Sequence, residues 1–229
     1  MNDDIHITPY IAAAVDNELR KIIVDNGKKV TLNKREFFLK QGTINSFVYV
    51  HSGLLGRIRD TPLEFKQTHL EIIPAGRVAN FLNFFSPGKA RISIQALRNS
   101  EIYLTPYKTV YAIMENDRRI AHEFEQMYGA NMETALRSCY CNFIFSCESR
   151  LISLFRAMIR NYGIMPDGNG WMLLPYKLTR EEYSQIIFSS LLTLDNILLQ
   201  WKKEGVYKKA KEGSYIHQSL PLRSIAYAP

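Results

Sequence analysis

The sequence predicts an α+β protein of three parts. These are an antiparallel β-roll with an N-terminal helix over residues 1–106, a long helix over residues 107–146 and a winged helix–turn–helix over residues 147–229. Short segments rich in Val, Ile, Tyr and Phe, separated by Gly, Pro and Asn, precede residue 106 and are typical of antiparallel strands. The middle part has helical periodicity and contains no Pro. The last part holds helical segments followed by a hairpin pattern, which is the order of a winged helix.

Length and composition limit the class of protein. The 229 residues, 46% hydrophobic and 22% charged, suffice for one large or two small globular domains. No apolar run approaches the roughly 20 residues that span a bilayer, and the acidic start MNDDIHITPY does not resemble a signal peptide. We therefore expect a cytoplasmic protein with no membrane partner. The net charge of +7 and the pI of about 9.2 are compatible with a nucleic-acid partner.

The β-roll is expected to follow an N-terminal helix, because hydrophobic residues between Ile11 and Ile23 recur roughly at helical spacing. After this helix the pattern changes to strands. Their regular spacing, with no long helical segment between them, favours a small antiparallel barrel or roll. The expected strands are VTLN (30–33), FFLKQG (37–42), FVYVHSGLLGRIRD (47–60), HLEIIPAGRV (69–78), RISIQALR (91–98) and SEIYLT (100–105).

The long helix carries a heptad pattern. Ile113, Ile120 and Met127 recur every seven residues, and Phe124 lies near the complementary position. This pattern predicts a two-helix coiled coil between two copies of the chain, with these four residues as the dimer seam. The alternative is a single helix lying on a domain, because some seam positions hold polar residues. These are Asp117, Asn131 and Ser138.

Residues 184–205, SQIIFSSLLTLDNILLQWKKEG, have the outline of a helix–turn–helix. Ser190 suits the N-cap of the second helix, and Thr179 with Glu182 has capping-box spacing before the first. One stripe of the second helix is apolar and is expected to be buried; it consists of Leu194, Ile197, Leu198 and Trp201. The other face would meet the major groove of DNA; it consists of Leu191, Leu192, Asp195, Asn196 and Leu199.

This second face is unusual for a DNA reader. Asn196 suits a bidentate contact with adenine, and Leu191 and Leu192 suit thymine methyl groups, whereas Asp195 is expected to be repelled by phosphates. Residues 201–211 hold five lysines, which suit contacts with the phosphate backbone. The predicted DNA-contact residues are Ser189, Ser190, Leu191, Leu192, Thr193, Asp195, Asn196, Lys202, Lys203, Lys208 and Lys209.

Two other interpretations of the second helix remain open. Leu191 lies three residues before Leu194, so in the first interpretation it extends the buried stripe. In the second, the helix is a protein-contact surface that no longer reads DNA. The lysines that follow the helix argue against a loss of DNA binding.

In this order the three parts resemble the CRP/FNR superfamily of bacterial transcription regulators over nearly the whole chain. The resemblance rests on GKKVTLNKREFFLKQG (27–42), FVYVHSGLLGRIR (47–59), IIPAGRV (72–78), ALRNSEIYLTP (96–106) and LTREEYSQIIFSSLLTLDNILLQWKKEGV (178–206). It implies a cupin-like β-roll of the cyclic-nucleotide-binding type and a homodimer. It also implies a small-molecule effector bound between the roll and the long helix, a palindromic promoter site on DNA, and RNA polymerase as a candidate partner.

The sequence departs from this family at both of its functional sites. The cyclic-nucleotide branch has a Gly-Glu pair where this chain has Ala79-Asn80, and an Arg-Ser pair where it has either Ala90-Arg91 or Arg91-Ile92-Ser93. We therefore expect an unknown effector that is not a cyclic nucleotide. Most members have Arg, often followed by Glu, at the positions of Leu191 and Leu192, so their operator is not expected here. The expected effector pocket consists of Asn80, Phe81, Phe84, Arg91 and Ser93, although the phenylalanines also suit core packing.

The sequence contains no catalytic, metal-binding or cofactor pattern. Cys139 and Cys141 would lie about 200° apart on a helix, so they cannot converge on one metal ion. Cys141 falls on the heptad seam, which makes an intersubunit disulfide conceivable, but reduced and packed thiols are expected for the three cysteines, Cys147 included. His51, His69 and His122 show no ligand spacing.

Taken together, these patterns predict a homodimeric, DNA-binding transcription regulator that is not an enzyme. The alternative is a member of the same family that acts through protein–protein contacts without reading a DNA sequence.

Overall fold

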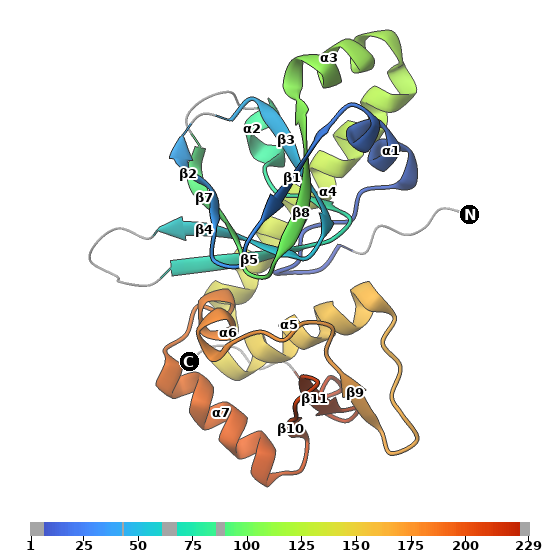
Figure 1. Cartoon of the computed structure of the whole chain (residues 1–229). Helices are drawn as coiled ribbons and strands as arrows, with labels where there is room; N and C mark the ends of the chain where they lie inside the picture. The colour runs from blue at the N-terminus through green and yellow to red at the C-terminus, as the bar shows by residue number, and fades with distance from the viewer. Residues whose placement is uncertain (1–6, 43, 61–67, 86–89, 225–229) are drawn as a thin grey trace. The chain divides into compact units, whose positions relative to one another are not determined.

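A computed structural model describes residues 7–42, 44–60, 68–85 and 90–224 of the chain (Figure 1). These residues form two compact units. The first contains most of the residues between Ile11 and Ala135, and the second contains Thr8–Tyr10 and the residues from Leu136 onward. Within the described ranges, no helix is both long enough and apolar enough to cross a bilayer.

Two four-stranded sheets form the β-roll of the first unit, which confirms the predicted fold class (Figure 1). The first sheet has the order β1-β8-β3-β6; its strands are β1 (Lys28–Leu32), β8 (Ser100–Pro106), β3 (Ser46–Ser52) and β6 (Arg77–Val78). The second has the order β2-β7-β4-β5; its strands are β2 (Phe37–Gly42), β7 (Ala90–Ala96), β4 (Leu54–Asp60) and β5 (Thr68–Pro74). Aliphatic side chains of both sheets, such as Val48 and Ile94, are completely buried in one shared core.

The single strand expected over residues 47–60 is two strands with a turn at Gly53. This residue has φ +92°, a conformation that side chains other than glycine rarely adopt. A Cβ atom at this position would also lie 2.3 Å from Oγ of Ser100, so the close approach of β8 requires glycine.

The N-terminal helix is shorter than predicted, because α1 spans only Asn17–Asp25. Ahead of it the described chain runs along the roll, where the N–H of Ala12 donates to the carbonyl oxygen of Ile72 over 3.3 Å. The helix begins where Asp16 caps it: Oδ1 of Asp16 accepts a hydrogen bond of 2.7 Å from the N–H of Glu18. The apolar spacing of the preceding residues serves packing along the strands instead of a helix.

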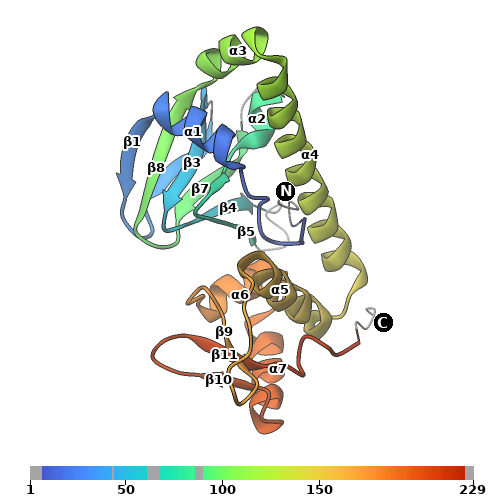
Figure 2. The same cartoon turned by 90° about the vertical axis from the view of Figure 1, so that its right-hand side faces the viewer.

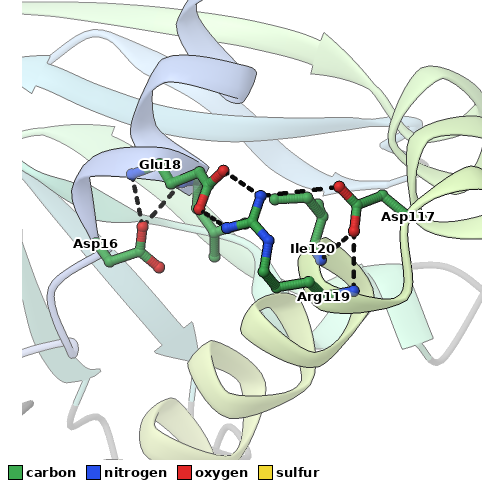
Figure 3. Close-up of polar contacts among 6 residues, drawn as sticks. Asp16, Glu18, Asp117, Arg119 and Ile120 are labelled. Atoms are coloured by element: carbon green, nitrogen blue, oxygen red, sulfur yellow. Dashed lines mark hydrogen bonds and ion pairs between the residues drawn. The ribbon is translucent and has the colours of Figure 1, made fainter. Parts of the chain in front are cut away.

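The long helix predicted over residues 107–146 is two helices, α3 (Tyr107–Asn116) and α4 (Arg118–Ile144). Asp117 separates them with an extended backbone, and its Oδ1 accepts a 2.9 Å hydrogen bond from the N–H of Arg119 (Figure 3). The guanidinium of Arg119 also forms two hydrogen bonds with the carboxylate of Glu18, and one of them, from Nη2 to Oε1, is 2.6 Å long. Arg119 therefore joins the start of α4 to α1.

The structure contradicts the predicted dimer seam. Ile120, Phe124 and Met127 are almost completely buried within the first unit, and Ile113 packs against the same cluster. This cluster joins α4 to α1, α3 and the short helix α2 (Phe81–Phe85) (Figure 2). A helix that lies on its own domain needs the same apolar spacing as a coiled coil, so the heptad pattern alone does not identify the partner.

The polar residues within this apolar stripe have defined partners. Oδ1 of Asn131 accepts a 3.1 Å hydrogen bond from the N–H of Ala13, and Oγ of Ser138 accepts one of 2.7 Å from the N–H of Tyr10. Asn131 and Ser138 are buried, so they satisfy backbone groups that would otherwise be desolvated without a partner. Asn131 and Ser138 are therefore polar because they bind the backbone of the extended segment that precedes α1, which the sequence pattern did not reveal.

The second unit is a winged helix–turn–helix, with its elements in the predicted order. They are α5 (Cys147–Tyr162), β9 (Trp171–Leu173), α6 (Arg180–Ile186), α7 (Leu191–Lys203), β10 (Tyr207–Lys209) and β11 (Ser214–His217). The strands form an antiparallel sheet of order β10-β11-β9. The hairpin β10–β11 was predicted, but β9 was not, because its three residues directly follow the turn-forming segment IMPDGNG.

Candidate nucleic-acid interface

The caps of the helix–turn–helix are those that the sequence predicts. Thr179 and Glu182 form a complete capping box before α6, with bonds of 3.1 and 2.7 Å. Oγ of Ser190 accepts a 3.0 Å hydrogen bond from the N–H of Thr193 and caps α7. Between the two helices, Phe188 has φ +49°, so the turn uses the left-handed conformation without a glycine.

Hydrophobic packing fixes the orientation of α7. Leu194 and Trp201 are fully buried, while Ile197 and Leu198 are half-buried. The ring of Trp201 packs 5.9 Å from that of Phe155 in α5. The predicted apolar stripe of α7 therefore faces inward, and the opposite face is held toward solvent.

The outward face of α7 is mainly apolar. Leu191, Leu192 and Leu199 are 41, 71 and 53% exposed, and Asn196 is exposed as well. The interpretation that Leu191 extends the buried stripe is therefore wrong. Single exposed leucines are common on protein surfaces, so these three leucines do not by themselves identify a partner.

Asp195 lies in the middle of this face and is paired with a residue that the sequence analysis missed. Nη1 of Arg180, at the start of α6, lies 2.8 Å from Oδ2 of Asp195. The guanidinium neutralises the carboxylate, which removes the main reason to expect that phosphates repel this helix. The two residues are fifteen positions apart and in different helices, so sequence spacing gave no signal for the pair.

Lysines surround this face on the end of α7 and on the wing. Lys202 and Lys203 are exposed in the last turn of α7. In the wing, Nζ of Lys208 lies 3.9 Å from the ring centroid of Trp171 and 5.2 Å from that of Tyr215, so aromatic rings hold this lysine in place.

A basic cleft of about 320 Å³ lies between the start of α6 and the wing. Its cationic lining residues are Lys177, Arg180, Lys209 and Lys211. Nζ of Lys177 donates a 3.0 Å hydrogen bond to the carbonyl oxygen of Lys211, which joins the two sides of the cleft. Sequence reasoning placed Lys209 in the interface but missed Lys177, which precedes the helix–turn–helix.

In the first unit, the structure fills the expected effector pocket with the side chains of the protein itself. Phe81 and Phe84 are buried in the core, as the core-packing alternative predicts. Ser93 is buried in β7, where Arg91 also lies, but the side chain of Arg91 is outside the described part of the chain. The burial of the two phenylalanines fits the core-packing alternative, and the effector pocket stays a prediction.

Asn80, another residue of the expected pocket, has hydrogen-bond partners within the protein. It is fully buried, and its Oδ1 accepts a 2.8 Å hydrogen bond from the N–H of Val48. Its Nδ2 donates to the carbonyl oxygen of Ser46 and to the hydroxyl of Tyr107 over 2.6 and 2.7 Å. Burial raises the pKa of Tyr107 far above its ordinary value, so this hydroxyl stays neutral.

The roll contains a buried ion pair that the sequence did not reveal. Nη2 of Arg57 in β4 lies 3.2 Å from Oε1 of Glu71 in β5, and both side chains are almost completely buried. The guanidinium carbon of Arg57 also lies 4.6 Å from the ring centroid of Phe81. Through this contact the ion pair lies next to one residue of the expected effector pocket.

The three cysteines differ in their exposure, and only Cys141 has the fully packed environment that was expected. Cys141 is buried, and burial raises its pKa, so it is not placed for a disulfide with a second chain. Cys139 is exposed and Cys147 is half-buried. Among the residues that the structure describes, no three His, Cys, Asp or Glu side chains are grouped closely enough to hold a metal ion.

No family model and no curated protein match this sequence. Solved structures, in contrast, match most of the chain. FixK2 from Bradyrhizobium japonicum is 16% identical, with 88% of this chain and 99% of that one covered at a TM-score of 0.71. The c-di-GMP-responsive global regulator CLP from Xanthomonas campestris is 12% identical, with 88 and 99% covered and a TM-score of 0.69. A CRP/FNR family transcriptional regulator from Thermus thermophilus is 13% identical, with 86 and 99% covered and a TM-score of 0.65.

These identities are low, so the similarity is one of fold. It extends through the β-roll, the helical segment and the winged helix. The predicted resemblance to the CRP/FNR superfamily is therefore confirmed at the level of the fold.

Proposed function

We propose that this protein is a homodimeric, DNA-binding transcription regulator of the CRP/FNR type. The observation that carries the proposal is the surface of the second unit, where an exposed helix face is surrounded by cations of α7, the wing and the basic cleft. In a helix–turn–helix complex, the second helix enters the major groove and neighbouring cations contact phosphates. The fold shared with the transcriptional regulator from Thermus thermophilus supports this function.

The DNA contacts follow from this placement. Residues 191, 192, 195, 196 and 199 of α7 face the base edges in the groove. Lys202 and Lys203 at the end of α7, with Lys208 and Lys209 on the wing, contact the phosphates on either side. Ser189, Ser190 and Thr193, near the N-terminus of α7, lie where backbone phosphates pass.

A different face of α4 carries the proposed dimer contact. Leu136, Tyr140 and Phe143 are 65, 55 and 81% exposed, and their spacing of four and three residues places them in one line. Gly129 continues this line toward the N-terminus of α4, and its missing Cβ faces open space, so a second helix can approach closely there. This line replaces the seam predicted from Ile113, Ile120, Phe124 and Met127.

The effector and RNA polymerase are the remaining proposed partners. The first unit is the part proposed to respond to an effector, which the departures from the cyclic-nucleotide motifs make something other than a cyclic nucleotide. Chemical selectivity there would have to come from polar groups inside the apolar roll, such as the buried side chains of Arg57 and Glu71.

A gel-shift experiment with the promoter region of the protein's own gene tests the proposal. We expect a retarded complex at low salt, with or without cell extract as a source of effector. The absence of a complex under both conditions would refute DNA binding and favour the alternative in which the leucine-rich face of α7 contacts another protein.

The salt dependence of binding then tests the placement on DNA. Replacing Lys202 and Lys203 with Ala removes two cations from each chain of the proposed dimer, so it should reduce the slope of log Kd against log salt by roughly 3.6, since each phosphate contact contributes about 0.9. Replacing Lys28 and Lys108 with Ala removes the same charge from exposed positions of the first unit and should leave the slope unchanged.

A further inference from the structure

We propose that Arg180 reads a guanine in the operator and that Asp195 positions it for this contact. The inference rests on the proposed DNA-binding function and adds a reader that is not part of α7. It explains how a helix whose outward face has no cation can still recognise a guanine, which requires two hydrogen-bond donors.

The outward face of α7 offers few groups that match base edges. It presents three leucines, Asn196 and Asp195, and the helix has no Arg or Lys before Lys202. Asn196 suits adenine, and leucines contact only thymine methyl groups. None of these groups supplies the paired donors that a guanine requires, so recognition of a guanine would depend on a guanidinium from another element.

Arg180 brings this guanidinium onto the face. Asp195 follows Leu191 by four residues and Leu192 by three, so its carboxylate lies on the same side of the helix and within its first two turns. These are the turns that reach base edges when a recognition helix docks. The 2.8 Å bond from Nη1 of Arg180 to Oδ2 of Asp195 therefore anchors the guanidinium where bases are read.

The pair leaves Arg180 able to bind. The side chains of Arg180 and Asp195 are 56 and 39% exposed, and the bond to Asp195 uses one of five N–H donors. A guanine takes two donors, at O6 and N7. Fixing the guanidinium in advance also lowers the entropy lost when the contact forms.

Electrostatics favour a base contact for Arg180 over a phosphate contact. The Arg180–Asp195 pair is neutral as a unit, so it gains little from the negative charge of the phosphate backbone. Base edges carry no net charge and select partners by the direction of their hydrogen bonds. The exposed lysines Lys202, Lys203 and Lys209 lack this arrangement with Asp195 and suit phosphates instead.

Selection from a random double-stranded DNA library, with the full chain and its variants, tests the inference. Wild-type protein should select a half-site that contains an invariant guanine. Arg180→Ala and Arg180→Lys should both lose the preference at that base pair, by roughly tenfold or more in relative affinity, because lysine keeps the charge but not the planar fork. Circular dichroism of each variant verifies that it is folded.

Asp195→Asn separates a positioning role from simple charge neutralisation. If Asp195 positions Arg180, this variant loses preference at the same guanine while its affinity for all DNA rises, because a negative charge has been removed. A rise in affinity with unchanged preference would assign Asp195 to charge neutralisation and overturn the inference. Lys209→Ala is the matched control, which should weaken binding to all sequences about equally.

The outcomes also separate this inference from the proposed function. A selected motif that Arg180→Lys leaves intact, together with uniformly weaker binding of Arg180→Ala, would make Arg180 a phosphate contact; only the inference would then fail. If the wild-type chain selects and binds no DNA, both the inference and the proposed function fail.

Discussion

The indole N–H of Trp201 donates a 2.6 Å hydrogen bond to Oε1 of Glu148, and this bond joins the last turn of α7 to the first turn of α5. Trp201 is fully buried, so its N–H has no access to solvent. Nη1 of Arg223 lies 3.4 Å from the same oxygen of Glu148, and its Nη2 lies 2.5 Å from Oε2 of Glu204. The segment after the wing therefore contacts both ends of this interaction, at α5 and at the end of α7. The orientation of α7 therefore depends on a polar bond as well as on its apolar stripe.

Trp201→Phe should lower the free energy of unfolding of the second unit by about 2 kcal/mol, because it removes a donor to a charged acceptor and leaves a small gap. Urea denaturation followed by circular dichroism measures this change. Glu148→Gln keeps an acceptor oxygen for the indole N–H, so it should lower the free energy of unfolding clearly less than Trp201→Phe does. An equal loss in the two variants would contradict this account of the hydrogen bond.

Two leucines of α7 should respond in opposite ways to truncation. Leu194 is fully buried, so Leu194→Ala should destabilise the protein by about 2–5 kcal/mol. Leu192 is 71% exposed, so Leu192→Ala should change stability by less than about 0.5 kcal/mol and should instead alter DNA binding. Guanidinium denaturation and gel shifts on both variants measure the two effects, and a stability loss at Leu192 comparable with that at Leu194 would contradict the orientation of α7.

Asn80→Ala should destabilise the first unit by about 3 kcal/mol or more, since the N–H of Val48, the carbonyl of Ser46 and the hydroxyl of Tyr107 all lose a buried partner. Thermal unfolding measures the loss. Asn116→Ala removes one exposed bond, to the carbonyl of Ala112, and should cost less than about 1 kcal/mol. A stable Asn80→Ala protein would restore Asn80 as a candidate effector contact.

Leu136→Asp combined with Phe143→Asp should convert the proposed dimer into a folded monomer, because the two side chains are 65 and 81% exposed and burying new charges would oppose association. Analytical ultracentrifugation at micromolar concentration measures the change. Met165→Asp alters a residue that is 80% exposed in the loop after α5 and should leave the mass unchanged. If the wild-type chain itself sediments as a monomer, the proposed dimer contact through α4 is wrong.

Glu123→Gln should stabilise the protein at neutral pH. Partial burial and then the carboxyl of Asp16 raise the pKa of Glu123 above its ordinary value, while His122 lowers it and Glu18 raises it further. A carboxyl with a raised pKa in the fold contributes stability that is present below its unfolded pKa and is lost as the pH rises through its folded pKa. Near pH 4 the Glu123 carboxyl is largely protonated in both the folded and the unfolded chain. The stability gained from Glu123→Gln should therefore be smaller at this pH than at neutral pH.

Melting temperatures at pH 7.5 and pH 4 measure this difference. Glu115→Gln makes the same change in net charge at an exposed position of α3 and serves as the control. An equal gain from both variants at neutral pH would mean that the effect comes from overall charge and not from the contact between Glu123 and Asp16.

The order of elements was predictable because strands, helices and hairpin have distinct periods and clear turn residues. Caps such as Thr179 and Ser190 were predictable too, since each involves residues at most three positions apart. Contacts between distant segments were not. The spacing of Ile120, Phe124 and Met127 correctly indicated a buried face, but the partner is the chain's own roll.

The same limit applied to the site. Leu191 could be assigned to the buried or to the exposed face until the position of Trp201 fixed the rotation of α7. Arg180 was overlooked because nothing in its own neighbourhood indicates that Asp195 is its partner. Interactions between residues close in sequence, such as helix caps, could be predicted, whereas an ion pair between two helices could be found only from the structure.

The winged-helix unit is discontinuous in sequence, because it includes Thr8–Tyr10. The hydroxyl of Tyr10 donates to Oδ1 of Asn142 over 3.0 Å, and Nδ2 of Asn161 donates to Oγ1 of Thr8 over 2.7 Å. A fragment that starts at Leu136 would carry every residue of the proposed DNA interface and yet lack the buried Tyr10 and its hydrogen bond to Asn142. A chimeric regulator that receives this unit should therefore also receive the segment Thr8–Tyr10.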